Sequence, residues 1–488
     1  MSRLHHRSEL QRIARQALVA RDLLPEFDHT ALAQLDRICQ SPSNHDNGVR
    51  DLRSLLWCSI DNDESMDLDQ LSVAEDLGSG LVRVYVAIAD VDVLVERATP
   101  IDLHAGHNTA SVYAAGHVFP MLPEKLSTDL TSLGPGVDRP SIVVEYEVSP
   151  EGNVGASEVS RALVHNWAKL TYHAVGDWLD DRGPLPGAAA AVPGMDSQLR
   201  LQTSASERLR RLRHEKGALD LISLQARPIF QDDAVVGLRA EEPNRAKWLI
   251  EEFMIAGNGV VARFLDAKSR PSLRRVVRSP ERWLKIVEVA AKYGHSLPGQ
   301  PSSRALEAFL SERRLADPEH FPDLSLVIIK LMGPGEYVAE LPGGPHVGHF
   351  GLSVRDYSHA TAPNRRFADL VTQRLLKAAL REVPSPYDLD DLVEIARRCT
   401  LQEGNIAKVE RQVSKSAAVL LLERRVGETF QGIITGAAEK GTWVRVFEPP
   451  VEGRIVQRMG GLRVGDKVRV TLVSTDFERG YLDFARTS

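Results

Sequence analysis

Cysteine and long apolar runs are scarce in this chain of 488 residues. Its three cysteines, Cys39, Cys58 and Cys399, are too few and too scattered for a disulfide framework or a zinc knuckle. The chain has no run of about 18 apolar residues, and its first residues form an amphipathic helical pattern without the apolar region of a signal peptide. We therefore expect a cytoplasmic protein with no membrane partner.

Positive charge is also not in excess, since the formal net charge is −6. This balance argues against a protein that coats nucleic acid indiscriminately. It still permits a protein that threads a strand through a locally basic channel, because the distribution of charge matters more than its sum. The hydrophobic content of 43% supplies enough apolar side chains for roughly three domains.

The residue patterns predict an α/β fold of the mixed α+β type in three parts. Residues 1–48 show apolar positions at helical spacing and then a polar linker, which predicts a small helical module that is either helix-turn-helix-like or a structural cap. Residues 49–425 read first as strands and then as helices, which predicts one large domain with a mixed sheet. Residues 426–488 contain five short strands with turns between them, the pattern of an OB-fold barrel.

Three aromatic residues lie on the early strands of this barrel, namely Phe430, Trp443 and Phe447. Barrels of this kind stack the bases of single-stranded nucleic acid on such side chains. The alternative is a place in the barrel core, which we expect for at least one of the three.

The most informative segment is SIDNDESMDLDQ, residues 59–70, which lies between strand-like segments. Its acidic residues are Asp61, Asp63, Glu64, Asp67 and Asp69. Carboxylates in contact repel one another by about 4 kcal/mol per pair at an effective dielectric near 20. A divalent cation, or open water, has to relieve this repulsion.

Two other interpretations of the acidic segment are weaker. An EF-hand loop is excluded because Met66 and Ser72 occupy the positions that require glycine and glutamate. A solvated acidic turn accounts well for Asp63 and Glu64. It accounts less well for Asp67 and Asp69, which alternate with apolar residues and so project from one face of an extended segment.

We expect the carboxylates of Asp61, Asp67 and Asp69 to converge on Mg²⁺, with Mn²⁺ as a substitute, because hard cations take oxygen ligands. Such a site suits hydrolysis of a phosphodiester, since the metal polarises the phosphoryl oxygens and lowers the pKa of an attacking water.

The same segment resembles the signature of the ribonuclease II and ribonuclease R exoribonucleases, the RNB catalytic domain. The phrases VYVAIADVDVLV, KGALDL, WLIEEFMIAGN and YSHATAPNRRFADLVTQRLL follow that family's order between residues 50 and 400. The resemblance implies a processive 3′→5′ exoribonuclease that hydrolyses single-stranded RNA to nucleoside 5′-monophosphates. It also implies an RNA-binding barrel of the ribosomal protein S-one type at the C-terminal end. The first fifty residues are too few for the family's cold-shock barrels, so we expect a form without them.

The family's active-site residues can be transferred position by position. Asp61, Asp67 and Asp69 match three of its four aspartates, and Asp69 matches the one most essential to chemistry. The fourth position is Gln70, which either coordinates the metal weakly or faces solvent while water takes its place. Arg365 matches an arginine that would hold the scissile phosphate, although an ion pair with Asp369 is the competing interpretation.

The resemblance also implies contacts to RNA. Tyr113 matches an aromatic residue that stacks on the 3′-terminal base, and the alternative is a buried tyrosine bonded to backbone. Either Glu251 or Glu252 is expected to accept a hydrogen bond from the ribose 2′-hydroxyl. Arg366 and Tyr357 are further expected RNA contacts.

Two rival functions remain at this point. The first is a catalytically impaired RNA-binding regulator that keeps the fold, for which Gln70 is the supporting feature. The second is a phosphodiesterase that acts on DNA or small nucleotides and turns over deoxy and ribo oligomers alike. We expect a monomer in each case.

Overall fold

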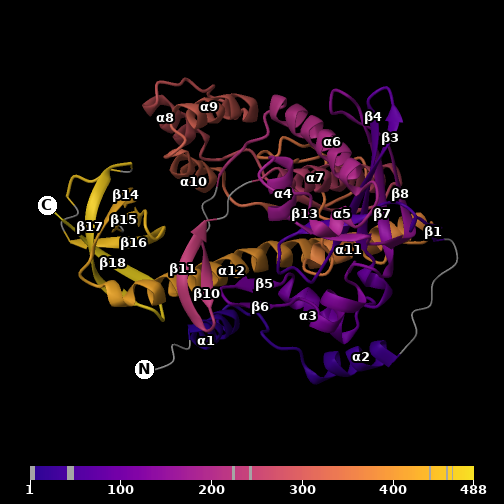
Figure 1. Cartoon of the computed structure of the whole chain (residues 1–488), viewed down its shortest axis with the longest axis horizontal. Coiled ribbons are helices and arrows are strands. Elements are labelled where there is room, and N and C mark those ends of the chain that lie inside the picture. Colours follow the sequence, from indigo (N-terminus) through magenta and orange to yellow (C-terminus); the bar gives the residue numbers. More distant parts are fainter. Residues whose placement is uncertain are drawn as a thin grey trace.

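The large domain is built on a seven-stranded sheet with the strand order β1-β8-β7-β4-β3-β2-β9 (Figure 1). Its strands are β1 (Arg50–Asp51), β2 (Cys58–Asp61), β3 (Gln70–Gly78), β4 (Leu81–Ala89), β7 (Asp138–Val148), β8 (Val154–His165) and β9 (Ala168–Thr171). The central strands are antiparallel, whereas β1 pairs with β8 and β2 pairs with β9 in parallel. This computed structural model describes residues 6–40, 49–222, 226–240, 244–438, 441–457, 460–463 and 465–487.

Two long helices, α6 (Met195–Glu215) and α7 (Arg245–Ala267), pack together on this sheet. The core between these helices and the sheet includes Trp57, Tyr146 and Phe253, which are all fully buried. The helices of this part are η1 (Val91–Val93), α3 (Pro100–Asn108), the π-helix η2 (Lys125–Leu130), α4 (Tyr172–Leu179), α5 (Gly187–Ala190), α6 (Met195–Glu215), α7 (Arg245–Ala267) and α11 (Phe367–Leu380). A small hairpin of β5 (Val112–Ala114) and β6 (His117–Phe119) follows α3.

A helical lobe, made of α8 (Trp283–Lys292), α9 (Ser303–Ala316) and α10 (Phe321–Met332), has its own apolar core. The two-stranded sheet of β12 (Ser272–Val276) and β13 (Glu336–Glu340) precedes and follows it in the chain. The side chains of Asp323 on α10 and Arg445 on the barrel form an ion pair of 2.8 Å. The lobe therefore contacts the C-terminal barrel as well as the large domain.

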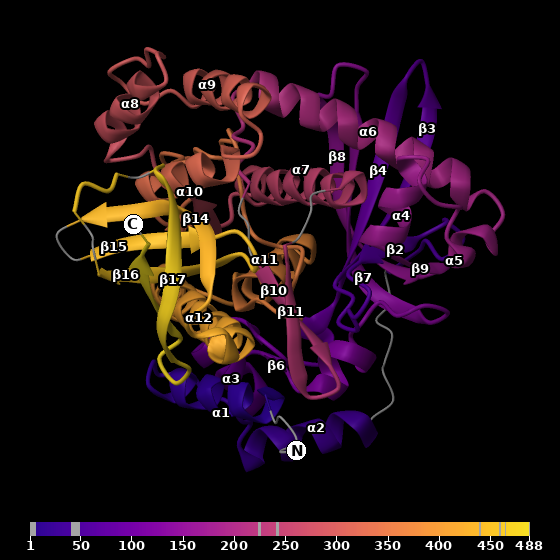
Figure 2. The same cartoon turned by 60° about the vertical axis from the view of Figure 1, so that its left-hand side comes forward.

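The N-terminal helices cover one edge of the molecule (Figure 2). Helix α1 (His6–Val19) buries Leu10, Ile13 and Leu18 against α12 (Leu389–Leu422), and α2 (His29–Gln40) packs on α3. Each helix thus packs mainly against the large domain, which favours the structural cap over the helix-turn-helix alternative. The linker predicted at 41–48 lies outside the described residues.

Helix α12 (Leu389–Leu422) joins the large domain to the barrel through η3 (Glu423–Arg425). It begins with a capping box formed by Asp388 and Asp391. A hairpin of β10 (Ala226–Gln231) and β11 (Ala234–Ala240) packs against α12 and was not predicted from the sequence.

The C-terminal residues form a closed barrel with the order β14-β15-β16-β18-β17. Its strands are β14 (Thr429–Ala438), β15 (Gly441–Val446), β16 (Val451–Gln457), β17 (Lys467–Asp476) and β18 (Tyr481–Arg486). The five-stranded OB-like barrel and the mixed α/β fold predicted from the sequence are confirmed. Across the described ranges, no helix is both long and apolar enough to cross a bilayer.

Candidate active site

Asp69 lies directly before β3, and its side chain is 2% exposed. Its Oδ1 accepts a hydrogen bond of 2.8 Å from the backbone N–H of Asn364, and its Oδ2 lies 3.3 Å from Nε of Arg365. Burial raises the pKa of Asp69 to about 7, and the charge of Arg365 opposes this rise. The structure therefore brings together the two residues that the sequence singled out most strongly.

Arg365 is held by its backbone while its side chain stays accessible. Its N–H donates to the carbonyl of Ala362 over 3.2 Å, and its own carbonyl accepts from the N–H of Ser111 over 3.0 Å. The side chain is 40% exposed. A fixed backbone with an exposed guanidinium suits a residue that contacts a ligand phosphate.

The competing interpretation of Arg365, an ion pair with Asp369, is wrong for this residue. Asp369 pairs instead with Arg366, whose Nη2 lies 2.7 Å from Oδ1. The same Oδ1 accepts from the N–H of Ala362 over 2.8 Å. Arg366 is thus engaged in holding the turn that carries Arg365, and its role as an RNA contact stays a prediction.

Tyr113 lies on β5, and its hydroxyl donates to Oδ2 of Asp67 over 3.2 Å. Its side chain is 46% exposed, so the alternative of a buried tyrosine bonded to backbone is wrong. The N–H of Tyr113 donates to Oε1 of Glu410 on α12 over 2.9 Å. Burial raises the pKa of Asp67, and the negative charge of Asp61 contributes in the same direction.

The predicted convergence of three carboxylates is not present in the side-chain positions. Within the described ranges, no three His, Cys, Asp or Glu side chains form a group able to hold a metal ion. Each aspartate has its own partner instead: Asp69 faces Arg365, Asp67 faces Tyr113, and Asp61 accepts from the N–H of Asn62 over 2.7 Å. Mutual repulsion between carboxylates favours such separate partners.

The donor atoms nevertheless fit a hard cation. Oδ2 of Asp69 is buried and accepts no hydrogen bond from any described residue. The cationic side chain of Arg365 meets this oxygen at 3.3 Å, and the oxygen keeps a second lone pair for a metal ion or a proton. Gln70 follows Asp69 directly in an extended segment, so we expect its side chain to point to the opposite face.

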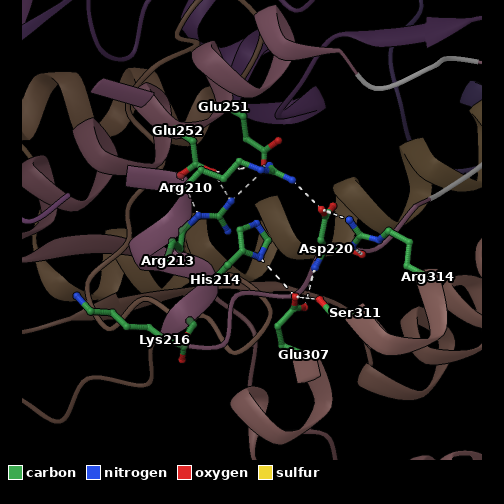
Figure 3. Close-up of polar contacts among 11 residues, drawn as sticks. Arg210, Arg213, His214, Lys216, Asp220, Glu251, Glu252, Glu307, Ser311 and Arg314 are labelled. Atoms are coloured by element: carbon green, nitrogen blue, oxygen red, sulfur yellow. Dashed lines mark hydrogen bonds and ion pairs between the residues drawn. The ribbon is translucent and has the colours of Figure 1, made fainter. Parts of the chain in front are cut away.

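Glu251 and Glu252 differ sharply in their surroundings (Figure 3). Glu252 is 2% exposed and accepts two hydrogen bonds from Arg213, of 3.0 Å from Nε and 2.6 Å from Nη2. The side chain of Glu251 is 48% exposed and lies 3.5 Å from Nη2 of Arg213. Of the two candidates, Glu251 is therefore the one that can reach a ligand.

Two of the aromatic residues predicted to contact RNA are buried, and for Phe430 this agrees with the expectation that at least one of the three barrel aromatics lies in the core. Tyr357 is buried and packs edge-on against His349 and His359, so it has little surface to offer RNA. Phe430 is buried in the barrel core, edge-on to Phe484. Alternation along a strand does not tell which face of a barrel is inside. The sequence therefore could not show that Phe430 lies in the core while Trp443 and Phe447 are more exposed.

Trp443 is partly buried and Phe447 is 36% exposed, and both stay candidates for RNA stacking.

One residue of the site was not predicted. Asn364 is fully buried, its N–H donates to Asp69, and its Oδ1 accepts from Oγ1 of Thr131 over 2.6 Å. In the sequence it is only one letter of the segment YSHATAPNRRFADLVTQRLL, beside Arg365. Its contacts link the turn of Arg365 to the acidic segment.

The family of the chain follows from comparison with sequence models. The model described as the RNB domain matches residues 49–382, and the model described as the RNase II-type exonuclease C-terminal S1 domain matches residues 428–487. This chain belongs to the RNB domain family. Ribonucleases of the RNB family are metal-dependent nucleases.

Two curated relatives of this RNB-family chain are ribonucleases R. Ribonuclease R 1 of Lactococcus lactis subsp. lactis (strain IL1403) is 27% identical, over 96% of this chain and 60% of its own length. Ribonuclease R of Escherichia coli (strain K12) is 28% identical, over 92% of this chain and 58% of its own length. The chain thus spans about 60% of the length of the first of these relatives.

Among solved structures, Mycoplasma genitalium RNase R in complex with ribose methylated single-stranded RNA has a TM-score of 0.88 to this RNB-family chain. The two are 22% identical, and the match covers 98% of this chain and 78% of that one. The likeness establishes a shared fold.

Proposed function

We propose that this RNB-family chain is a 3′→5′ exoribonuclease that hydrolyses single-stranded RNA processively to nucleoside 5′-monophosphates. The observation that supports this most is the pairing of buried Asp69 with the accessible guanidinium of Arg365. The proposal includes the three-part division at residues 1–48, 49–425 and 426–488, and action as a monomer in the cytoplasm.

The proposed chemistry is attack of water on the 3′-terminal phosphodiester. The P–O bond to the 3′ oxygen breaks, and that oxygen takes up a proton as it departs. Oδ2 of Asp69 would hold the attacking water by accepting its hydrogen bond, which is supported by the absence of any hydrogen bond to this oxygen from the described residues. Arg365 would hold the non-bridging oxygens and offset the charge that grows on them.

A divalent cation fits this scheme beside the carboxylates. Asp69 and Asp67 would hold it. Asp61 would become a third ligand only if its side chain left the position in which it accepts from the N–H of Asn62, and Gln70 would be a weak ligand or none. When bound, Mg²⁺, or Mn²⁺ as its substitute, would lower the pKa of the water and neutralise phosphate charge.

Two further residues would position the RNA. The exposed ring of Tyr113 would stack on the terminal base, an interaction that tolerates any base and is worth ~1 to 3 kcal/mol. The carboxylate of Glu251 would accept a hydrogen bond from the 2′-hydroxyl, the group that separates RNA from DNA.

The proposal is tested by incubating the full chain with 5′-labelled oligoadenylate and Mg²⁺ and separating the products by size. We expect mononucleotides and a short labelled end product, without a ladder of intermediates if the enzyme is processive. The matched deoxy oligomer should be degraded far more slowly. Stable complexes without mononucleotides would favour the rival RNA-binding regulator, and equal turnover of both oligomers would favour the phosphodiesterase.

A further inference from the structure

A groove with a volume of about 330 Å³ lies where α12, the end of α1 and the barrel meet. Five cationic side chains line it, together with one amide and one tyrosine. The cations are Arg21, Lys408, Arg411, Lys415 and Arg479, and the tyrosine is Tyr481. Among the described lining residues there is no carboxylate, although the whole chain carries a net charge of −6.

The cations on α12 are available to a ligand. Lys408, Arg411 and Lys415 recur at the spacing of one helix face, along about 10 Å of the helix axis. Lys408 and Arg411 are exposed, and Lys415 is partly exposed. Within the described part of the chain, no carboxylate forms an ion pair with any of these three side chains.

The nearby acidic side chains leave most of this charge uncompensated. Asp476 lies 3.8 Å from Arg479, whose side chain is 73% exposed. Glu478 is engaged by Arg12 on α1, outside the groove lining. Arg21 donates to Oε1 of Gln412 over 3.3 Å, a neutral partner that leaves its charge in place.

The groove lies away from the candidate active site. Glu410, which accepts from the N–H of Tyr113, is on the same helix. Because successive residues of a helix are about 100° apart, Lys408, Arg411 and Lys415 point away from the side of Glu410. A ligand in the groove would therefore be separated from Tyr113 by the body of α12.

We propose that this groove binds the phosphate backbone of single-stranded RNA at a second site outside the active site. The row of unpaired cations matches a polyanion, and the ring of Tyr481, 56% exposed, can stack on a base beside it. An acidic peptide would match the charge but would not use the ring. The proposal rests on the proposed function for the identity of its ligand, and it implies that long RNAs bind more tightly than those that only fill the active site.

The test measures binding of full-length protein in EDTA, so that no hydrolysis occurs, by fluorescence anisotropy at several salt concentrations. The RNAs are oligoadenylates of roughly 6 and roughly 30 nucleotides, since single-stranded sites on such barrels take ~4 to 16 nucleotides. The variant is Lys408→Gln with Lys415→Gln. The matched control is Lys285→Gln with Lys292→Gln, two exposed lysines of helix α8 in the helical lobe.

For the groove variant, we expect affinity for the long RNA to fall about tenfold and the slope of log K against log salt to decrease by about 1.4, which is 0.7 for each lost phosphate contact. The short RNA should bind as it does to the wild type, and the control variant should bind both RNAs normally. Tyr481→Leu should also weaken binding of the long RNA, whereas Tyr481→Phe should not.

Three outcomes would overturn the proposal. These are an unchanged affinity for the long RNA, an equal loss for both RNAs, and binding of poly-glutamate as tight as that of RNA with the same sensitivity to the groove variant. The measurement needs no catalysis, so a chain that bound RNA in the groove but released no mononucleotides would contradict only the proposed exoribonuclease activity.

Discussion

Nε of Arg365 lies 3.3 Å from Oδ2 of Asp69, a buried carboxylate oxygen that accepts no hydrogen bond from the described residues. The two residues come from distant segments, and the N–H of Asn364 fixes the second segment to Oδ1 of Asp69. A phosphate can bind to the cationic guanidinium of Arg365, and a metal ion can bind to the anionic oxygen of Asp69 beside it.

Arg365→Ala should lower kcat about 100-fold or more, because removing one preformed donor to a developing oxyanion typically costs that much. Arg365→Lys should recover part of the loss, since it restores the charge without the planar fork. Single-turnover hydrolysis of a short oligoadenylate measures both. If Arg365→Ala hydrolysed RNA at the wild-type rate, the phosphate-holding role would be excluded.

Tyr113→Ala should lengthen the final undigested oligomer and weaken binding of short RNAs, because a stacking surface worth ~1 to 3 kcal/mol per base is lost. Tyr113→Phe keeps the ring and loses only the hydroxyl that donates to Asp67. The end product of Tyr113→Phe should therefore match that of the wild type. Equal effects of the two substitutions on end-product length would show that the hydroxyl, not the ring, matters.

Glu251→Gln and Glu252→Gln should affect different properties of the protein. Glu252→Gln removes the buried charge that accepts two hydrogen bonds from Arg213 and leaves the more distant, exposed Glu251 beside it, so it should destabilise the fold by about 3 kcal/mol in thermal or urea unfolding. Glu251→Gln should leave stability nearly unchanged and reduce the preference for ribo over deoxy oligomers in kcat/KM. A wild-type preference in Glu251→Gln would remove Glu251 from the ribose contact.

The pKa of Asp69 predicts how stability depends on pH in EDTA. Burial raises this pKa from 3.8 to about 7, so between these values the folded protein binds more protons at Asp69 than the unfolded chain. The free energy of unfolding contributed by this residue therefore falls as pH rises from about 4 to 7. Asp69→Asn should be more stable than the wild type at pH 8, by up to about 4 kcal/mol, with the difference vanishing near pH 4. A wild-type melting temperature at both pH values would contradict this prediction.

Much of the fold could be predicted from local patterns. The first part of residues 49–425 was expected to be rich in strands, and β4 indeed lies between β3 and β7 in the sheet. The hairpin β10–β11 was missed because its residues show neither strict alternation nor a short turn motif. Its packing against α12 is a tertiary contact that no local pattern encodes.

The site was predictable only in part, for physical reasons. The spacing of Asp67 and Asp69 indicated a shared face, but Asn364 acts through its backbone N–H, which any residue type but proline would supply. Likewise, Arg365 and Arg366 are adjacent and chemically identical. Only the fold decides that Arg366 pairs with Asp369 and that Arg365 faces Asp69.

The most direct test of the central claim compares Asp69→Asn with Asp63→Asn, an exposed acidic residue of the same segment. Both are measured for RNA binding and for release of mononucleotides from oligoadenylate with Mg²⁺. We predict that Asp69→Asn binds RNA with nearly wild-type affinity but releases mononucleotides at least about 100-fold more slowly, on the scale of losing a preorganised electrostatic group. Asp63→Asn should behave as the wild type. Wild-type release of mononucleotides by Asp69→Asn would contradict the account.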